Sequence, residues 1–371
     1  MRFAYGQVSL YTATPNTRKE FYMDETKEKV CSFRNLYKAM RKCKRNVMWK
    51  DSVAGYIKNG LVNCYKLRQA LMSDTYEIDK YSLFTIYEPK KRDIVSTRMK
   101  DRVFQRSLSD NYLYGEVTNS FIWDNCACQT GKGTSQARDR LKCHMQRYFR
   151  KHGINGYVLK CDLSNYFGST PHSVAKEAVS TRIDNAWVEQ HASKIIDSFN
   201  QGEDPDVGMG LGSQITQLTQ LAVLDELDHI IKERLGIKQY IRYMDDFILI
   251  HDDKEYLKCC WDEIDNYLVS LQLTLSKKKT QIFPIEQGIK FLGFIFYLTD
   301  TGKVIMKLPK ENVTHEKRKL KKLKGLVERG EMTKEHVDEC YNSWKAHAQQ
   351  GNTHNLILSM NQFYKNLWEE E

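Results

Sequence analysis

The feature that most constrains this sequence is a pair of adjacent acids between two runs that favour buried β-strands. Asp245 and Asp246 separate the runs Gln239–Met244 and Phe247–His251. A two-residue hairpin turn normally favours Asn-Gly or Asp-Gly, because its central residues often need a positive φ, and two like charges side by side repel each other. The sequence therefore predicts two strands that meet at the acids, and a functional reason for placing the acids there.

A third acid ends another strand-like run. Asp162 closes the run Gly156–Asp162, which is rich in residues that favour strands. If these strands are neighbours in one sheet, Asp162 and the acidic pair converge, and three carboxylates could hold two Mg²⁺ ions about 3.5–4 Å apart. Two alternatives stay open: the acidic pair is a solvated turn, and Asp162 is a helix cap for the segment from Ser164 onward.

Composition limits the class of protein and of partner. The 371 residues allow two or three domains, and 41% hydrophobic with 28% charged residues excludes wholesale disorder. A net charge of +10 suits a polyanionic partner. No apolar run approaches the roughly 18–20 residues of a membrane span, and the start of the chain lacks the apolar stretch of a signal peptide. We therefore expect a soluble, cytoplasmic protein without a membrane partner.

Periodicity and turn residues predict the other elements. Residues 1–75 are expected to be mostly helical and residues 81–97 extended. Helices are expected over Lys100–Leu113 and Ser135–Arg150, after the glycine loop Gly208–Gly212, and from Pro309 onward. The last strand-like run, Gly288–Leu298, is expected to form one buried strand despite Gly293.

These motifs together resemble the palm of reverse transcriptases. The Tyr-Met-Asp-Asp sequence at 243–246, followed by an apolar strand, is that family's most specific signature, and Lys160–Phe167 resembles its first catalytic motif. Four further parts occur in the same order as in the family: 89–94 with 100–105 resembles the fingers, 208–217 the glycine loop and helix, 275–280 a later palm motif, and 291–294 the primer-grip strand.

The resemblance implies an α+β right-hand polymerase fold with fingers, an antiparallel-sheet palm and a helical thumb. The implied boundaries are a helical amino-terminal extension at 1–80, fingers at 81–155, a palm at 156–300 with an insertion at 171–205, and a basic helical thumb at 301–371. It also implies an RNA-directed DNA polymerase, a nucleotidyltransferase that adds dNTPs to the 3′-hydroxyl of a DNA or RNA primer on template RNA.

The same resemblance implies roles for individual residues. Asp162, Asp245 and Asp246 would be catalytic and, with the backbone carbonyl of Leu163, would bind two Mg²⁺ ions, with Mn²⁺ as a substitute. The implied nucleotide-binding residues are Lys91, Arg92, Phe167, Leu211, Gly212 and Lys279, with Phe167 beneath the sugar and Lys279 as proton donor to pyrophosphate.

The thumb sequence indicates a cationic helix. Basic residues flank Leu320, Leu323, Leu326 and Val327, which recur at helical spacing. The solvent-facing charges could serve solubility alone; beside a polymerase palm we expect them to contact the template–primer backbone. The residues expected to do so are Lys317, Arg318, Lys321, Lys322 and Lys324.

The glycine loop indicates a branch of the family. Many reverse transcriptases carry Gln where this chain has Leu211, between Gly210 and Gly212. An apolar residue there resembles bacterial reverse transcriptases of diversity-generating retroelements, which are related to phage-defence and group II intron enzymes. Segments 343–348 and 353–356 resemble the end of their thumb. This branch implies low-fidelity cDNA synthesis with a small accessory protein or a structured non-coding RNA.

Two departures leave other roles open. Thr216 stands where Ser is usual and Gly210 where Pro is usual, which leaves room for an antiphage-defence enzyme with templated or untemplated DNA synthesis. A second alternative is a non-polymerising nucleic-acid-binding protein on the same scaffold, although such a protein would not need three converging carboxylates.

Leu211 yields a prediction about fidelity. If its apolar side chain packs beneath the templating base pair, it cannot hydrogen-bond to that pair, and Leu211→Gln should lower the error rate with comparable extension on a matched template. Each ~1.4 kcal/mol of restored discrimination lowers misincorporation about tenfold. Sequencing of cDNA made by both proteins on one RNA measures this; equal error spectra from equally folded proteins would refute the low-fidelity interpretation.

Overall fold

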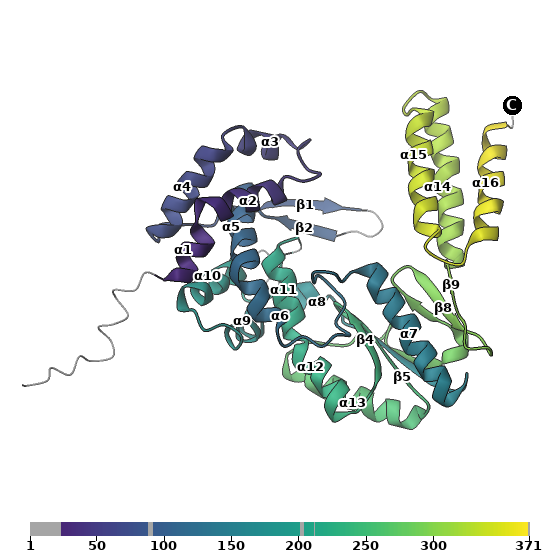
Figure 1. Ribbon diagram of the computed structural model, residues 1–371. Helices are drawn as coiled ribbons and strands as arrows, with labels where there is room; N and C mark the ends of the chain where they lie inside the picture. Colours follow the sequence, from purple (N-terminus) through teal and green to yellow (C-terminus); the bar gives the residue numbers. More distant parts are fainter. Residues whose placement is uncertain (1–23, 88–91, 201–203, 211, 370–371) are drawn as a thin grey trace, which may run out of the picture. The chain divides into compact units, whose positions relative to one another are not determined.

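The computed structural model describes residues 24–87, 92–200, 204–210 and 212–369 (Figure 1). These residues form two compact units. The first unit draws on the ranges 1–121 and 167–223, and the second on 122–166 and 224–371. No helix within the described ranges is long and apolar enough to cross a bilayer.

The first unit is mainly helical, and its helices enclose an apolar core that includes Leu36, Leu67 and Phe104. A two-stranded antiparallel sheet, β1–β2, lies between α4 and α5 in the chain. The elements are α1 (Glu25–Cys31), α2 (Phe33–Cys43), α3 (Asp51–Lys58), α4 (Gly60–Met72), β1 (Ser82–Ile86), β2 (Arg92–Ser96), α5 (Met99–Leu108), a π-helical turn (Ser109–Leu113), α6 (Tyr114–Thr118), α8 (Tyr166–Ser169), α9 (His172–Ser180), α10 (Ala186–Asp197) and α11 (Gln214–Val223).

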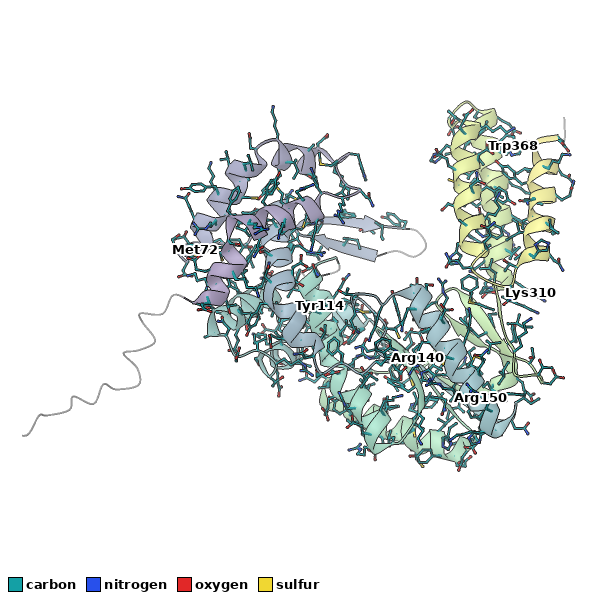
Figure 2. All side chains as sticks on the ribbon, viewed as in Figure 1. Met72, Tyr114, Arg140, Arg150, Lys310 and Trp368 are labelled. Carbon is teal, nitrogen blue, oxygen red and sulfur yellow. The ribbon has the colours of Figure 1, made fainter. Side chains whose placement is uncertain are left out.

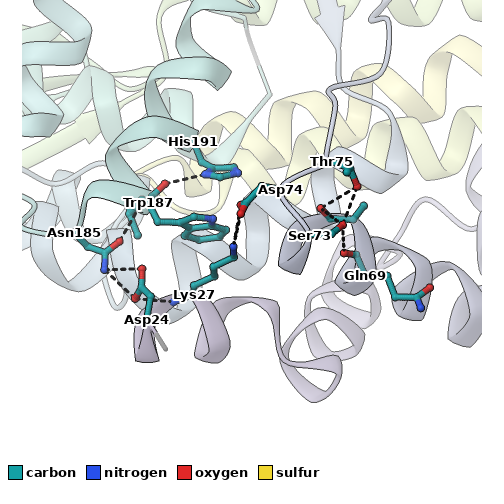
Figure 3. Close-up of polar contacts among 11 residues, drawn as sticks. Asp24, Lys27, Gln69, Ser73, Asp74, Thr75, Asn185, Trp187 and His191 are labelled. Atoms are coloured by element: carbon teal, nitrogen blue, oxygen red, sulfur yellow. Dashed lines mark hydrogen bonds and ion pairs between the residues drawn. The ribbon is translucent and has the colours of Figure 1, made fainter. Parts of the chain in front are cut away.

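Polar contacts fasten α1 to α10 and to the end of α4 (Figure 3). Asp24 caps α1 by accepting the Thr26 and Lys27 amides, and its carboxylate also accepts the Asn185 side chain at 3.0 and 3.1 Å. Asn185 in turn caps α10. Lys27 Nζ lies 2.9 Å from both oxygens of Asp74. Two helix caps therefore also serve as a tertiary contact, because the Asp24 carboxylate can accept several hydrogen bonds and Asn185 caps with its oxygen while its amide nitrogen donates.

The second unit contains two antiparallel sheets. The four-stranded sheet has the order β4-β5-β3-β6, and the three-stranded sheet has the order β7-β8-β9. The elements are α7 (Thr134–His152), β3 (Tyr157–Asp162), α12 (Asp225–His229), a π-helical turn (Ile230–Arg234), β4 (Gln239–Tyr243), β5 (Asp246–His251), α13 (Lys254–Ser270), β6 (Gln281–Pro284), a 3₁₀ turn (Ile285–Gln287), β7 (Ile289–Phe291), β8 (Phe294–Leu298), β9 (Val304–Lys307), α14 (Lys310–Glu328), α15 (Lys334–Ala348) and α16 (His354–Glu369).

The expected strands that carry the acids are confirmed. β3 pairs with β5 in an antiparallel register that puts Asp162 opposite Asp246, and β5 also pairs with β4. The central strands are apolar: Val158, Leu159, Ile248 and Leu249 are fully buried. Because adjacent residues point to opposite faces and both faces are buried here, these strands form nearly continuous apolar runs, and Asp162 and Asp246 fall at their ends.

One expected strand is wrong. Gly288–Leu298 is not one strand but a hairpin, in which β7 and β8 pair antiparallel with Phe291 opposite Phe294. The two turn residues, Leu292 and Gly293, have φ values of 44° and 87°. Positive φ at both central residues is the geometry of a tight type I′ turn, which reverses the chain within an uninterrupted apolar run. Glycine at the second position makes this turn accessible.

The last three helices run side by side as a bundle (Figure 1). Leu320 of α14, Val337 of α15 and Met360 of α16 are fully buried in its core. Tyr341 and Tyr364 stack with ring centroids 4.4 Å apart, which joins α15 to α16. Figure 2 marks Lys310 and Trp368 near the two ends of this segment.

A buried carboxylate organises the region around α7. Asp124 is 2% exposed and accepts hydrogen bonds from His144 Nε2 at 2.8 Å, Lys232 Nζ at 2.7 Å and Arg140, which Figure 2 marks on α7. Burial alone would raise the pKa of Asp124, but these three donors outweigh it and hold that pKa below its usual range. The carboxylate is therefore ionised in the folded protein.

We expect Asp124→Asn to lower the free energy of unfolding by about 3–5 kcal/mol at pH 7, because it leaves buried cations without their partner. Because folding depresses the pKa of Asp124, its ionised carboxylate stabilises the fold at any pH above the unfolded-state pKa of about 3.9. This stabilisation is lost as the pH falls towards the depressed pKa. The difference in free energy of unfolding between variant and wild type should thus narrow only below about pH 4, which denaturant titrations from pH 5 to pH 2 measure. Asp139→Asn, at an exposed pair with Lys142, is the control and should change little; a constant gap would contradict the assignment.

Candidate active site

The acidic residues lie at one end of the central strands. Asp162 ends β3, Asp246 begins β5, and the register makes them direct neighbours on one face of the sheet. The β4–β5 turn consists of Met244 and Asp245, since Tyr243 pairs with Asp246. The expected acidic turn therefore needs a correction: one acid lies in the turn and the other in the strand. Met244, with φ of 58°, takes the strained first position.

A buried ion pair supports this turn. The Arg242 and Asp228 side chains are fully buried, and the guanidinium donates from Nε and Nη2 to the two carboxylate oxygens at 2.7 and 2.5 Å. Arg242 Nη1 donates to the Met244 carbonyl at 3.1 Å. Burial alone would lower the pKa of Arg242, but the attraction of Asp228 raises it, so the pair is ionised. The buried guanidinium thus holds the Met244 carbonyl, and with it the backbone of the acidic turn, in place.

Sequence reasoning missed this pair. Its signal was a charged residue within the strand-like run Gln239–Met244, where a buried position requires a partner. Asp228 supplies it from α12, and Tyr240 also donates to Asp228 Oδ1 at 2.6 Å. The partner could not be identified from the sequence, because several acids precede the strand.

Asp246 has a cationic partner. Lys160 Nζ lies 3.0 and 3.1 Å from its two oxygens. Burial raises the pKa of Asp246 to about 6; Lys160 acts in the opposite direction, and the neighbouring charges of Asp162 and Asp245 raise it further. Three carboxylates are therefore close enough to interact electrostatically, and this group favours an added cation.

Asp162 is held by the segment that follows α13. Its carbonyl accepts the Ser276 amide at 2.7 Å, and Ser164 N donates to the Thr274 carbonyl at 2.9 Å. Lys279 Nζ lies 2.6 Å from Asp162 Oδ1, while its side chain is 54% exposed. Lys279, one of three consecutive lysines in this segment, therefore contacts the acid.

Asp162, Asp245 and Asp246 supply carboxylate oxygens, the type of ligand that a hard divalent cation prefers. Asp246 Oδ1 is buried and accepts no hydrogen bond of good geometry, although the Lys160 ammonium lies beside it. Leu163, whose carbonyl was expected to assist, forms a β-bridge with Leu275 next to Asp162. Within the described ranges, no three His, Cys, Asp or Glu side chains are already clustered as a metal centre. Instead, the ammonium group of Lys160 contacts Asp246 and that of Lys279 contacts Asp162, and both supply positive charge to the acids.

Among the described residues expected to bind the nucleotide, Arg92, Phe167 and Gly212 belong to the first unit and Lys279 to the second. Phe167 packs partly buried beside Ala175, Ile196 and Met209. Gly212 has a φ of 98° just before α11. Lys91 and Leu211 lie outside the described residues, and Arg92 begins β2 with a side chain that is likewise outside them.

The five basic residues of α14 that are expected to contact nucleic acid divide into two groups. Arg318, Lys321 and Lys322 are exposed. Lys317 and Lys324 are partly buried: Lys317 lies over the Phe363 ring at 5.1 Å, and Lys324 lies 3.5 Å from Glu328. The exposed group is free to meet a polyanion, whereas the other two also serve contacts within the protein.

Comparison with known proteins identifies a family. The family described as Reverse transcriptase (RNA-dependent DNA polymerase) matches residues 83–296. This match, over more than half of the chain, confirms the expected α+β right-hand polymerase fold. No curated protein matches the chain.

Similar solved structures include two telomerases. One is from Candida albicans in complex with a fragment of telomeric RNA, at 10% identity, a TM-score of 0.47, and coverage of 72% of this chain and 55% of that one. The other is apo telomerase from Candida tropicalis, at 14% identity, a TM-score of 0.45, and coverage of 60% and 47%. The chain thus spans about half the length of these solved chains.

The buried pair yields a prediction. Arg242→Met should lower the free energy of unfolding by about 3–5 kcal/mol, because it leaves Asp228 buried and unpaired. The double variant Arg242→Met/Asp228→Leu should recover most of that stability. Both variants should lose nucleotide incorporation, because in both the Met244 carbonyl lacks its donor. Chemical denaturation and nucleotide incorporation measure the two effects separately. Recovery of activity in the double variant would show that the ion pair only stabilises the fold.

Proposed function

This chain belongs to the reverse transcriptase family, and we propose that it synthesises DNA on an RNA template by adding dNTPs to a primer 3′-hydroxyl. The observation that carries the proposal is the pairing of Asp162 with Asp246 across β3 and β5, beside the Tyr-Met-Asp-Asp turn and inside the segment that matches the family. Because the chain covers only part of its structural relatives, the activity and substrates of the whole protein are part of this proposal.

We assign the catalytic role to Asp162, Asp245 and Asp246, with the Leu163 carbonyl as a further oxygen ligand. Two bound Mg²⁺ ions, replaceable by Mn²⁺, would activate the primer hydroxyl and stabilise charge on the transferred phosphate. For the acids to bind them, Lys279 would have to leave Asp162, which its exposed side chain permits. It would then be free to donate a proton to pyrophosphate.

The remaining assignments follow the family resemblance. Lys91 and Arg92 would neutralise the triphosphate, Phe167 would lie beneath the sugar, and Leu211 with Gly212 would contact the nascent base pair. Lys317, Arg318, Lys321, Lys322 and Lys324 would contact the template–primer backbone. The corresponding domains would be an extension at 1–80, fingers at 81–155, a palm at 156–300 with the insertion at 171–205, and a thumb at 301–371.

For the biological role we propose low-fidelity cDNA synthesis in a diversity-generating retroelement, together with a small accessory protein or a structured non-coding RNA. Leu211 in the glycine loop supports this branch. Gly210 and Thr216 depart from it and support the alternative of an antiphage-defence enzyme. Neighbouring DNA distinguishes the two roles: a variable-repeat target gene with a near-identical template repeat indicates the retroelement.

The central test is Asp245→Asn. We expect nucleotide incorporation on a primed RNA template to fall at least a thousandfold, because the change removes a metal ligand from the acidic turn. RNA affinity should stay within about threefold of wild type, since no phosphate contact is lost. Primer extension with Mg²⁺ and RNA binding without dNTPs measure the two effects.

The matched control is Asp262→Asn on α13, which removes one acid from the same unit outside the proposed site. It should extend the primer as wild type does. A wild-type protein that binds RNA but incorporates no nucleotide would favour the non-polymerising alternative, and an Asp245→Asn variant with half the wild-type rate would reject the metal-ligand role.

A further inference from the structure

We propose that Lys160 is a positioning residue, which fixes the Asp246 carboxylate relative to the β7–β8 hairpin; this inference rests on the proposed polymerase function. Lys160 lies on β3, two residues before Asp162, so both side chains point to the same face of the sheet. The register places Asp162 opposite Asp246, so Asp246 is the diagonal neighbour of Lys160 on that face. A lysine side chain can span that diagonal.

The ammonium of Lys160 contacts two different sheets. Nζ lies 3.0 and 3.1 Å from the two oxygens of Asp246 and donates to the Lys290 carbonyl at 2.6 Å. It also lies 6.0 Å from the centroid of the Phe291 ring. Asp246 belongs to the four-stranded sheet, whereas Lys290 and Phe291 belong to β7 of the three-stranded sheet. One side chain therefore ties a catalytic acid to the hairpin.

A comparison with Lys279 separates positioning from simple charge neutralisation. Lys279 neutralises Asp162 through one short contact from a side chain that is 54% exposed. Lys160 is 15% exposed and directs a donor at a backbone carbonyl, a contact that neutralises no charge. An ammonium has three donors in a compact head, and here they are shared between the acid and the hairpin. Holding the long Lys160 side chain in one conformation costs entropy, and a role in fixing the geometry between Asp246 and the hairpin explains why that cost is met.

A contact that fixes the Asp246 carboxylate would affect the reaction rate, because a catalytic acid must be held in a narrow range of positions. Reacting groups must be held within about 0.5 Å, and a displacement of about 1 Å can cost a hundredfold in rate. Asp246 begins β5 directly after the strained turn at Met244, so its backbone is already fixed there. Lys160 fixes the other end of the residue, the carboxylate.

The test compares Lys160→Met, Lys160→Arg and Lys303→Met. Lys160→Met keeps the chain length without the donors, Lys160→Arg keeps charge and donors, and Lys303→Met removes one exposed charge beside β9 as the control. On primed RNA with Mg²⁺, we expect kcat of Lys160→Met to fall about thirtyfold or more while KM for dNTP changes less than threefold. Lys160→Arg should recover kcat to within about fivefold of wild type, and Lys303→Met should match wild type.

A second readout does not depend on activity. Amide hydrogen exchange over residues 289–298 should become faster in Lys160→Met, because the hairpin loses its tether, and should be unchanged in Lys303→Met. If Lys160→Met does not fold, Lys160→Gln replaces it, since its shorter side chain cannot serve both the acid and the carbonyl.

Three results would overturn the inference: a Lys160→Met variant with kcat within threefold of wild type, a Lys160→Arg variant as slow as Lys160→Met, or unchanged exchange in the hairpin. A wild-type protein that incorporates no nucleotide would instead reject the proposed function. The exchange measurement then still decides whether Lys160 tethers the hairpin.

Discussion

The candidate site depends on a guanidinium buried beneath a two-residue turn. Arg242 pairs with Asp228 of α12 and donates to the Met244 carbonyl, while its own backbone exchanges hydrogen bonds with the Asp124 carbonyl and the Cys126 amide. One residue therefore connects a helix, a strand, the acidic turn and the segment before α7. Burying two charges is costly, and hydrophobic replacements of such pairs are often as stable. The planar, multiply donating guanidinium instead supplies a fixed geometry, which holds Met244 in a left-handed conformation that methionine otherwise avoids.

The acids that this turn presents create an electrostatic problem. Asp162, Asp245 and Asp246 lie close enough that two of them raise the pKa of the third, in addition to the effect of burial. Two lysines supply compensating charge in different ways: Lys279 is exposed and able to leave, whereas Lys160 is enclosed and also bonded to the hairpin backbone. The repulsion among the three carboxylates is relieved by lysines in this structure. The same repulsion favours binding of divalent cations, which the proposed chemistry needs.

Local pattern predicted much of the second unit and the position of its acids. The alternation of apolar and acidic segments gave β3, β4 and β5 nearly to the residue, because strands buried on both faces leave a strong hydrophobic signal. The prediction was wrong at Gly288–Leu298, where an apolar run conceals a turn. Hydrophobicity reports burial, not chain direction, so a turn formed by Leu292 and Gly293 left little signal beyond one glycine.

The sequence by itself determined the identity of the chemical groups: three acids at or beside strand ends, a basic helix after the last strand, and motifs specific enough to indicate the family. Only the tertiary structure decided which residues serve those groups. Arg242 with Asp228, Lys160 with Asp246 and the Lys290 carbonyl, and Lys279 with Asp162 are contacts between segments that are distant in the chain or lie on different strands. Periodicity records only which face a side chain points to. The partner across that face depends on strand register and sheet packing, which arise when the whole unit folds.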